Sequence, residues 1–346
     1  MLFLKATPAQ EPLPAELQER IVALLPLRDL KALCAHPRMI PTLRVHLKQR
    51  VIETLDSFRL KGQETLDMMS ASRTVLSGSA ALEIVSPGSC EPNNLNFYCP
   101  VGSAHHALSA ILATKGFVET PMSLKTLMSE RSPFNKFEVN NGVKRLYRLV
   151  HLPTKKTIIL AESISASPLA PILFFHSTLM MNYVTGTTAI SLYPDLTYER
   201  KGFLNYAVNF AKIHRPDVLD RWTGVGMSIW SDCHDLHDGH PSMSPTARKG
   251  MCQWAYRQIN DDWADRMAFQ RSPRLQLGPV LAWRLGHRYR TKKDVMHHKT
   301  SVHLVHEEWF KLCMYKKAVE WVRYYVPLVK ETGLIDQALW KRSFPN

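Results

Sequence analysis

The chain has 346 residues, of which 45% are hydrophobic and 21% charged, a composition that excludes an intrinsically disordered protein. Its formal net charge of +14 leaves two interpretations open, a polyanionic partner such as nucleic acid or an ordinary solvated cationic surface. The six cysteines include no Cys-x-x-Cys pair. This predicts a reduced protein of the cytoplasm or the nucleus rather than a disulfide-bonded one.

Residues 1–50 are expected to form a small all-helical unit. The first helix has Pro14 in its first turn, where proline is tolerated, and ends at Pro26. Its apolar residues at helical spacing are Leu17, Ile21, Leu24 and Leu25. A second short helix from Asp29 and a third from Thr42 complete the unit. So small a unit buries little surface alone and needs a neighbouring domain or a partner.

Residues 51–165 are expected to form an α/β domain with a mixed sheet. After a helical stretch to residue 69, short apolar runs alternate with helical patterns. The elements in chain order are a strand at 74–77, a turn at Gly78-Ser79, a helix at 80–85, a strand at 95–99, a helix at 103–115 and a hairpin with arms at 143–152 and 156–162.

Residues 166–346 are expected to form a mainly helical domain, which makes the whole chain an α+β protein. Helices are predicted over 171–184, 203–214 and 307–333. The apolar stretch that contains the first of them holds two prolines, a histidine and an asparagine. A buried helix is therefore expected there, and not a membrane span.

The stretch 74–100 resembles the nucleotidyltransferase fold. In that fold a Gly-Ser turn at a helix start binds triphosphate oxygens, and two carboxylates on the next strand hold divalent metal ions. Gly78 and Ser79 match the turn, but Asn94 and Asn96 stand where the carboxylates would be. Because Mg²⁺ normally needs a carboxylate, the resemblance implies a catalytically empty site without a cofactor. The two asparagines either bind local backbone or keep a vestigial contact with phosphate or nucleotide.

The N-terminal unit resembles the F-box, whose helices bind a Skp-type adaptor of a cullin–RING ubiquitin ligase through an apolar face. The residues that carry this resemblance, and that would contact the adaptor, are Leu13, Pro14, Leu17, Ile21, Leu24 and Leu30. The alternative is an ordinary amphipathic bundle packed on the next domain, because apolar helical spacing alone mostly indicates a core.

Both features together resemble a family of F-box-like proteins of mushroom-forming fungi with a degenerate nucleotidyltransferase-like domain. The segments that carry the resemblance are LSGSA (76–80), FY (97–98), FHST (175–178) and SLYP (191–194). Members of the family often have Asp-x-Asp where this chain has Asn94-Leu95-Asn96. The family has no settled activity, so the resemblance implies an architecture more than a function.

Histidine and cysteine residues offer three candidate chemical sites. The candidate zinc ligands are Cys233, His237, His240 and Cys252. The alternative for the polar segment 231–241 is a solvated loop. His303 and His306 are predicted on one helix face, without a further ligand. His176, in an apolar stretch, is more typical of a core histidine whose hydrogen bonds are satisfied.

These observations favour a non-catalytic interaction protein, an F-box-like substrate receptor that binds a Skp-type adaptor and an unknown target protein. One alternative is a divergent metal-dependent nucleotidyltransferase. Another is a protein that binds nucleic acid through the basic stretch 271–299, which has eight basic residues against the single acid Asp294. No membrane contact is expected.

Overall fold

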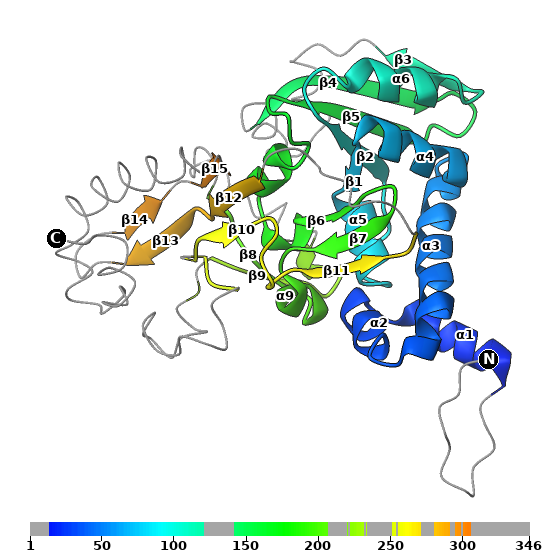
Figure 1. Ribbon diagram of the computed structural model, residues 1–346. Coiled ribbons are helices and arrows are strands. Elements are labelled where there is room, and N and C mark those ends of the chain that lie inside the picture. Colours follow the sequence, from blue (N-terminus) through cyan, green and yellow to red (C-terminus); the bar gives the residue numbers. More distant parts are fainter. Residues whose placement is uncertain are drawn as a thin grey trace, which may run out of the picture.

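The fold is known from a computed structural model, in which helices of the first seventy residues stand along one side of a large sheet (Figure 1). The residues that it describes are 14–120, 142–206, 220, 222–231, 233, 251–253, 255–270, 280–290, 295–298 and 300–305. No helix among these residues is long and apolar enough to cross a membrane.

The predicted N-terminal helices are present, and a fourth follows them. They are α1 (Ala15–Leu24), α2 (Leu27–Leu33), α3 (Ile40–Ser57) and α4 (Gly62–Ser72), with a 3₁₀ turn η1 (Pro37–Met39) before α3. Pro26 separates α1 from α2 because a proline inside a helix removes a backbone hydrogen bond. In α3 every fourth residue from Leu43 to Leu55 is apolar and buried, so one stripe of this helix faces the core.

Arg50 of α3 links the end of α1 to the sheet domain through hydrogen bonds. The Arg50 guanidinium donates hydrogen bonds to the carbonyl oxygens of Val22, Ala23 and Leu25 at the end of α1, at 3.2, 2.9 and 3.0 Å. It also donates to the carbonyl of Ile84, at 2.9 Å, in the helix that follows the Gly78-Ser79 turn. The last carbonyls of a helix have no partner within the helix, so Arg50 both caps α1 and ties it to the sheet domain.

The central element is an eight-stranded mixed sheet in the order β11-β7-β6-β1-β2-β5-β4-β3. Its strands are β1 (Val75–Ser77), β2 (Asn94–Cys99), β3 (Phe117–Thr120), β4 (Val143–His151), β5 (Thr157–Ser163), β6 (Asn182–Val184), β7 (Thr188–Ser191) and β11 (Asp265–Ala268). The helices α5 (Ser79–Val85) and α6 (Ala104–Leu112) lie within this part of the chain. The predicted strands, helices and hairpin of residues 74–165 are thus confirmed. The sheet also runs across the predicted domain boundary at residue 165.

The sheet separates two hydrophobic cores. One face carries Leu76, Leu95 and Phe97 and packs against the helices α1 to α4. The other face carries Val75 and Tyr98 and packs against a layer of residues beyond 168. Alternate residues of each strand therefore enter different cores, which follows from the two-residue period of a strand.

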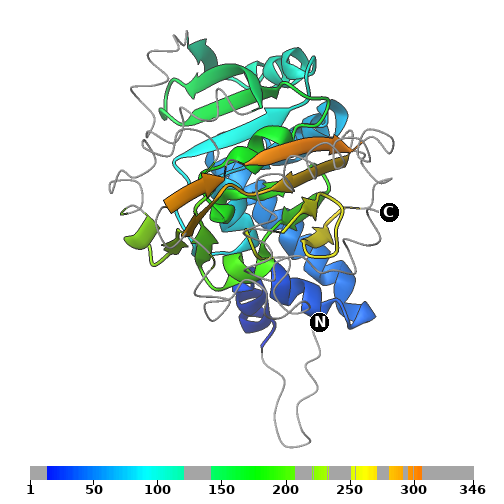
Figure 2. The same cartoon turned by 90° about the vertical axis from the view of Figure 1, so that its left-hand side faces the viewer.

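The prediction of a mainly helical region after residue 165 is wrong for the residues that the structure describes. Small sheets and short helices form most of this region, and Figure 2 shows strands in a layer in front of the large sheet. The remaining strands are β8 (Lys201–Phe203), β9 (Ser228–Trp230), β10 (Arg257–Gln258), β12 (Val280–Arg284), β13 (His287–Arg290), β14 (Val295–His298) and β15 (Ser301–Val305). The one α-helix with described bounds here is α9 (Pro194–Tyr198).

The predicted long helix over 171–184 is instead two 3₁₀ helices, η2 (Ala170–Phe174) and η3 (Thr178–Met180), followed by β6. The Ser177 hydroxyl accepts a hydrogen bond from the backbone N–H of Leu179, which starts a new turn in the middle of the stretch. A strand buried on both faces is apolar throughout, so a short apolar run does not distinguish it from a helix.

Three further helix predictions concern residues beyond 200. His303 lies in strand β15 and not on a helix. Of the predicted helix 203–214, residues 203–206 finish β8 and follow it, and the rest lies outside the described residues, as do His306 and the predicted helix 307–333.

Replacing Arg50 by methionine should lower the free energy of unfolding by about 3 kcal/mol, because four carbonyl groups lose their donor. The control Arg38→Met removes an exposed guanidinium and should change the free energy by less than about 0.5 kcal/mol. Urea unfolding followed by circular dichroism measures both values. Similar effects of the two substitutions would contradict the anchoring role.

Candidate functional site

The predicted phosphate-binding turn has a backbone that requires glycine. Gly78 has φ +79° and ψ −150°, a conformation that only glycine adopts readily, and α5 begins at the next residue. A β-carbon on Gly78 would lie 2.9 Å from the Nδ2 atom of Asn96. The amide of Asn96 therefore packs directly against the turn. The helix that starts there has seven residues, too few for a strong helix dipole.

Asn94 and Asn96 lie together on one face of β2, as the sequence predicts, and they bind each other. The Nδ2 group of Asn94 donates to the Oδ1 atom of Asn96 at 3.2 Å. In the register of the sheet, Asn96 is opposite Ser77 on β1 and Ile159 on β5, so neither neighbouring strand places a carboxylate beside it. Two amides can satisfy each other in this way, whereas two carboxylates at the same distance would repel.

Two carboxylates of the sheet domain, Glu162 and Glu83, have other partners. Glu162 is opposite Cys99 in the register, so it projects from the face of the sheet away from Asn94 and Asn96. Its Oε1 atom accepts from the backbone N–H of Gly102 at 2.8 Å and pairs with Lys144 at 3.3 Å. It therefore holds the turn after β2 in place.

Glu83 likewise organises a loop. Its carboxylate accepts from the backbone N–H groups of Gly88, Ser89 and Cys90, at 2.7, 2.9 and 3.0 Å. Nowhere in the described part of the chain do three or more His, Cys, Asp or Glu side chains lie together so that they could hold a metal ion. The sequence pattern gave no sign that these two glutamates were loop anchors, because their partners are backbone groups.

The predicted adaptor-binding residues fall into two groups. Leu17, Ile21 and Leu24 are 45%, 46% and 71% exposed, and Pro14 is exposed beside them. Leu30 is fully buried, so it packs the helical unit together and is not available to a partner. Leu13 lies outside the described residues.

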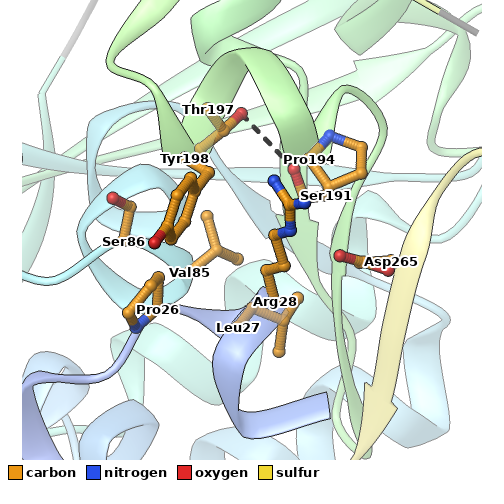
Figure 3. A pocket seen from close by; sticks show the side chains of 10 residues that line it. All are labelled: Pro26, Leu27, Arg28, Val85, Ser86, Ser191, Pro194, Thr197, Tyr198 and Asp265. Atoms are coloured by element: carbon orange, nitrogen blue, oxygen red, sulfur yellow. Dashed lines mark hydrogen bonds between the residues drawn. The ribbon is translucent and has the colours of Figure 1, made fainter. Parts of the chain in front are cut away.

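Two ion pairs connect α2 to α9 and to the edge strand β11. Arg28 of α2 pairs with Asp195 of α9 at 3.0 Å, and its guanidinium lies 4.9 Å from the centre of the Tyr198 ring. Lys31 pairs with Asp265 on β11 at 2.5 Å across a separation of 234 residues. Figure 3 shows the Arg28 side chain extending from α2 toward α9 over a shallow depression lined by residues of α2, α5, α9 and β11. Sequence patterns could not identify these pairs, because the partners are far apart in the chain.

The remaining predicted sites are only partly described. Cys233 and Cys252 lie together, with 3.6 Å between their sulfur atoms, while His237 and His240 lie outside the described residues. In the basic stretch 271–299, Arg284 is buried and lies over the ring of Tyr256 at 5.6 Å, which removes it from a nucleic-acid surface.

Comparisons of the chain with protein-family models, with curated proteins and with solved structures find no match. The F-box-like and nucleotidyltransferase-like units therefore stay predictions from the sequence. A functional assignment rests on the geometry of the described residues.

Replacing Gly78 by alanine should destabilise the protein by about 2–3 kcal/mol, through backbone strain and the contact with Asn96. The control Gly102→Ala also has a positive φ, +83°, but its β-carbon would meet nothing within 4 Å. It should cost about 1 kcal/mol, from strain alone. Thermal unfolding measures both. Adding Asn96→Ala to Gly78→Ala should recover part of the loss, and no recovery would contradict the contact.

Restoring carboxylates through Asn94→Asp and Asn96→Asp should make stability depend on pH. Two carboxyl groups at this distance raise the pKa of one of them above its value in the unfolded chain. The contribution of that group is present at low pH and is lost as pH rises through the raised pKa, at about pH 4 to 7. The free energy of unfolding of the double variant should therefore fall, relative to that of the parent, by about 2 kcal/mol over this range.

The matched control is Asn93→Asp, an exposed position next to the pair, which should add no such dependence. Urea unfolding at a series of pH values, with and without Mg²⁺, provides the measurement. A pH profile parallel to that of the parent would contradict the predicted repulsion.

Proposed function

We propose that this chain is a non-catalytic interaction protein, an F-box-like receptor that binds a Skp-type adaptor through α1 and a target protein through the rest of the molecule. The observation that carries the proposal is the exposed apolar face of α1, formed by Leu17, Ile21 and Leu24. This set is called the α1 stripe.

The α1 stripe differs from the scattered exposed apolar residues that are normal on protein surfaces. Its three residues are spaced by four and three positions, which places them within an arc of about 60° on the helix. Val22, on the opposite side of α1, is 4% exposed and packs into the core. A helix with apolar residues on both its inner and its outer side is suited to lie between its own core and a groove of a partner.

The attachment of α1 suits the role of a receptor. Arg50 holds the end of α1, and the pairs Arg28–Asp195 and Lys31–Asp265 hold α2 against the sheet domain. An adaptor bound at the α1 stripe would thus have a fixed orientation relative to the sheet domain. A substrate receptor needs such rigidity, because it has to present its target at a constant distance from the ligase.

The arrangement at β2 supports a function without catalysis. Asn94 and Asn96 bind each other, and Asn96 packs on Gly78. The carboxylates of Glu83 and Glu162 are engaged by backbone N–H groups. The described residues thus offer no specific observation in favour of a metal-dependent nucleotidyltransferase.

Ile21→Asp should weaken binding to a purified Skp-type adaptor at least tenfold, because a charge in the α1 stripe would be buried without a partner (about 1.4 kcal/mol or more). Ala23→Asp is the matched control, since it adds the same charge to the same helix on an exposed position away from the stripe. It should leave affinity unchanged. Calorimetry with the full chain measures both. Absence of adaptor binding by the folded parent protein would refute the proposal.

A further inference from the structure

Two cysteine thiols in the second core lie in contact. The sulfur atoms of Cys233 and Cys252 are 3.6 Å apart although 19 positions separate the residues in the chain. Cys233 is 1% exposed, and Cys252 is partly exposed and packs against the same hydrophobic cluster. One thiol is therefore sheltered, and the other can be reached from solvent.

Both cysteines are held in place by the same strand. Cys233 follows β9, which pairs with β8. Gln253, beside Cys252, is fully buried and donates from Nε2 to the carbonyl of Leu204, the residue after β8, at 2.7 Å. The two thiols are thus attached to neighbouring points of one strand. A disulfide bond is about 2.0 Å long, so the sulfurs need to approach by about 1.5 Å.

The other described cysteines are poor candidates for oxidation. Burial raises the pKa of the Cys99 thiol to about 12, and the nearby charge of Glu162 adds to this. Burial also raises the pKa of Cys34. The Cys90 thiol donates to the carbonyl of Ser79 at 3.5 Å. Because the thiolate is the reactive form, these raised pKa values disfavour oxidation of Cys34 and Cys99.

We propose that Cys233 and Cys252 are a site of reversible oxidation that forms a disulfide bond when the protein meets a hydroperoxide. The Cys252 thiolate attacks one peroxide oxygen of hydrogen peroxide, the O–O bond breaks, and hydroxide leaves. The sulfenic acid that results is attacked by the Cys233 sulfur, which forms the S–S bond and releases a second hydroxide. The two thiol protons convert both hydroxides to water. The two sulfurs together lose two electrons, and the two peroxide oxygens gain them.

The bond would join the end of β9 to the segment that leads into β10. It would close a loop of about 20 residues and reduce the freedom of the unfolded chain. The oxidised protein is therefore more stable than the reduced one. This inference does not depend on adaptor binding, because the thiol pair lies in the second core and the α1 stripe lies on the exposed side of α1, whose buried residue Val22 belongs to the first core.

The test treats the folded full-length protein with hydrogen peroxide, blocks remaining thiols with N-ethylmaleimide and maps the peptides without reduction. We expect one cross-linked peptide pair joining Cys233 to Cys252, lighter by two hydrogen atoms and restored by dithiothreitol. Oxidation should raise the midpoint of thermal unfolding by about 5 °C. Cys252→Ser should abolish the cross-link and the shift in midpoint, while the control Cys34→Ser should keep both.

Two results would overturn the proposal. One is oxidation that stops at sulfenic or sulfinic acid on Cys252 without a cross-link. The other is a stoichiometric zinc ion, detected by elemental analysis, that protects both thiols until a chelator removes it. In that case the short sulfur–sulfur distance reflects metal ligation. Because mass mapping uses the parent protein, the outcome does not depend on whether a variant folds.

Discussion

The position of the N-terminal helices depends on Arg50. A guanidinium has five N–H donors in a rigid planar arrangement, and here it binds carbonyl groups of both α1 and α5. Burial lowers its pKa to about 10, while Glu83 and Glu53 act in the opposite direction. The group thus stays charged at neutral pH. Without this contact the end of α1 would leave carbonyl groups unpaired near the core, and the α1 stripe would have no defined position.

The sheet separates the proposed adaptor surface from the asparagine pair. One face supports the helices that carry the α1 stripe, and the other faces the layer that contains Cys233 and Cys252. The asparagine pair lies on this second face, on the same side of β2 as Tyr98. The proposed adaptor surface and the asparagine pair are therefore on opposite sides of the sheet, so a target bound on the second side would not compete with an adaptor bound at the α1 stripe.

The sequence predicted the N-terminal half well, because its helices and strands carry clear periodic patterns and are close together in the chain. Leu30 shows the limit of this reasoning, since periodicity finds apolar positions but does not tell a buried one from a docking one. For the described residues after 165 the prediction of helices failed, because strands buried on both faces, such as β6, lack alternation. Arg50, Glu83 and Glu162 were missed as anchors because their partners are backbone groups, which leave no trace in the sequence.

The edge strand β11 joins the N-terminal helices to a segment more than 190 residues later in the chain, which affects synthesis. Met267 and Phe269 belong to the same core as the helices α1 to α4, and Lys31 pairs with Asp265. This core cannot close until residue 269 has left the ribosome, long after α4 has emerged. At roughly 5–20 residues per second the part of this core that Met267 and Phe269 cover stays open for about ten seconds or more after α4 has emerged.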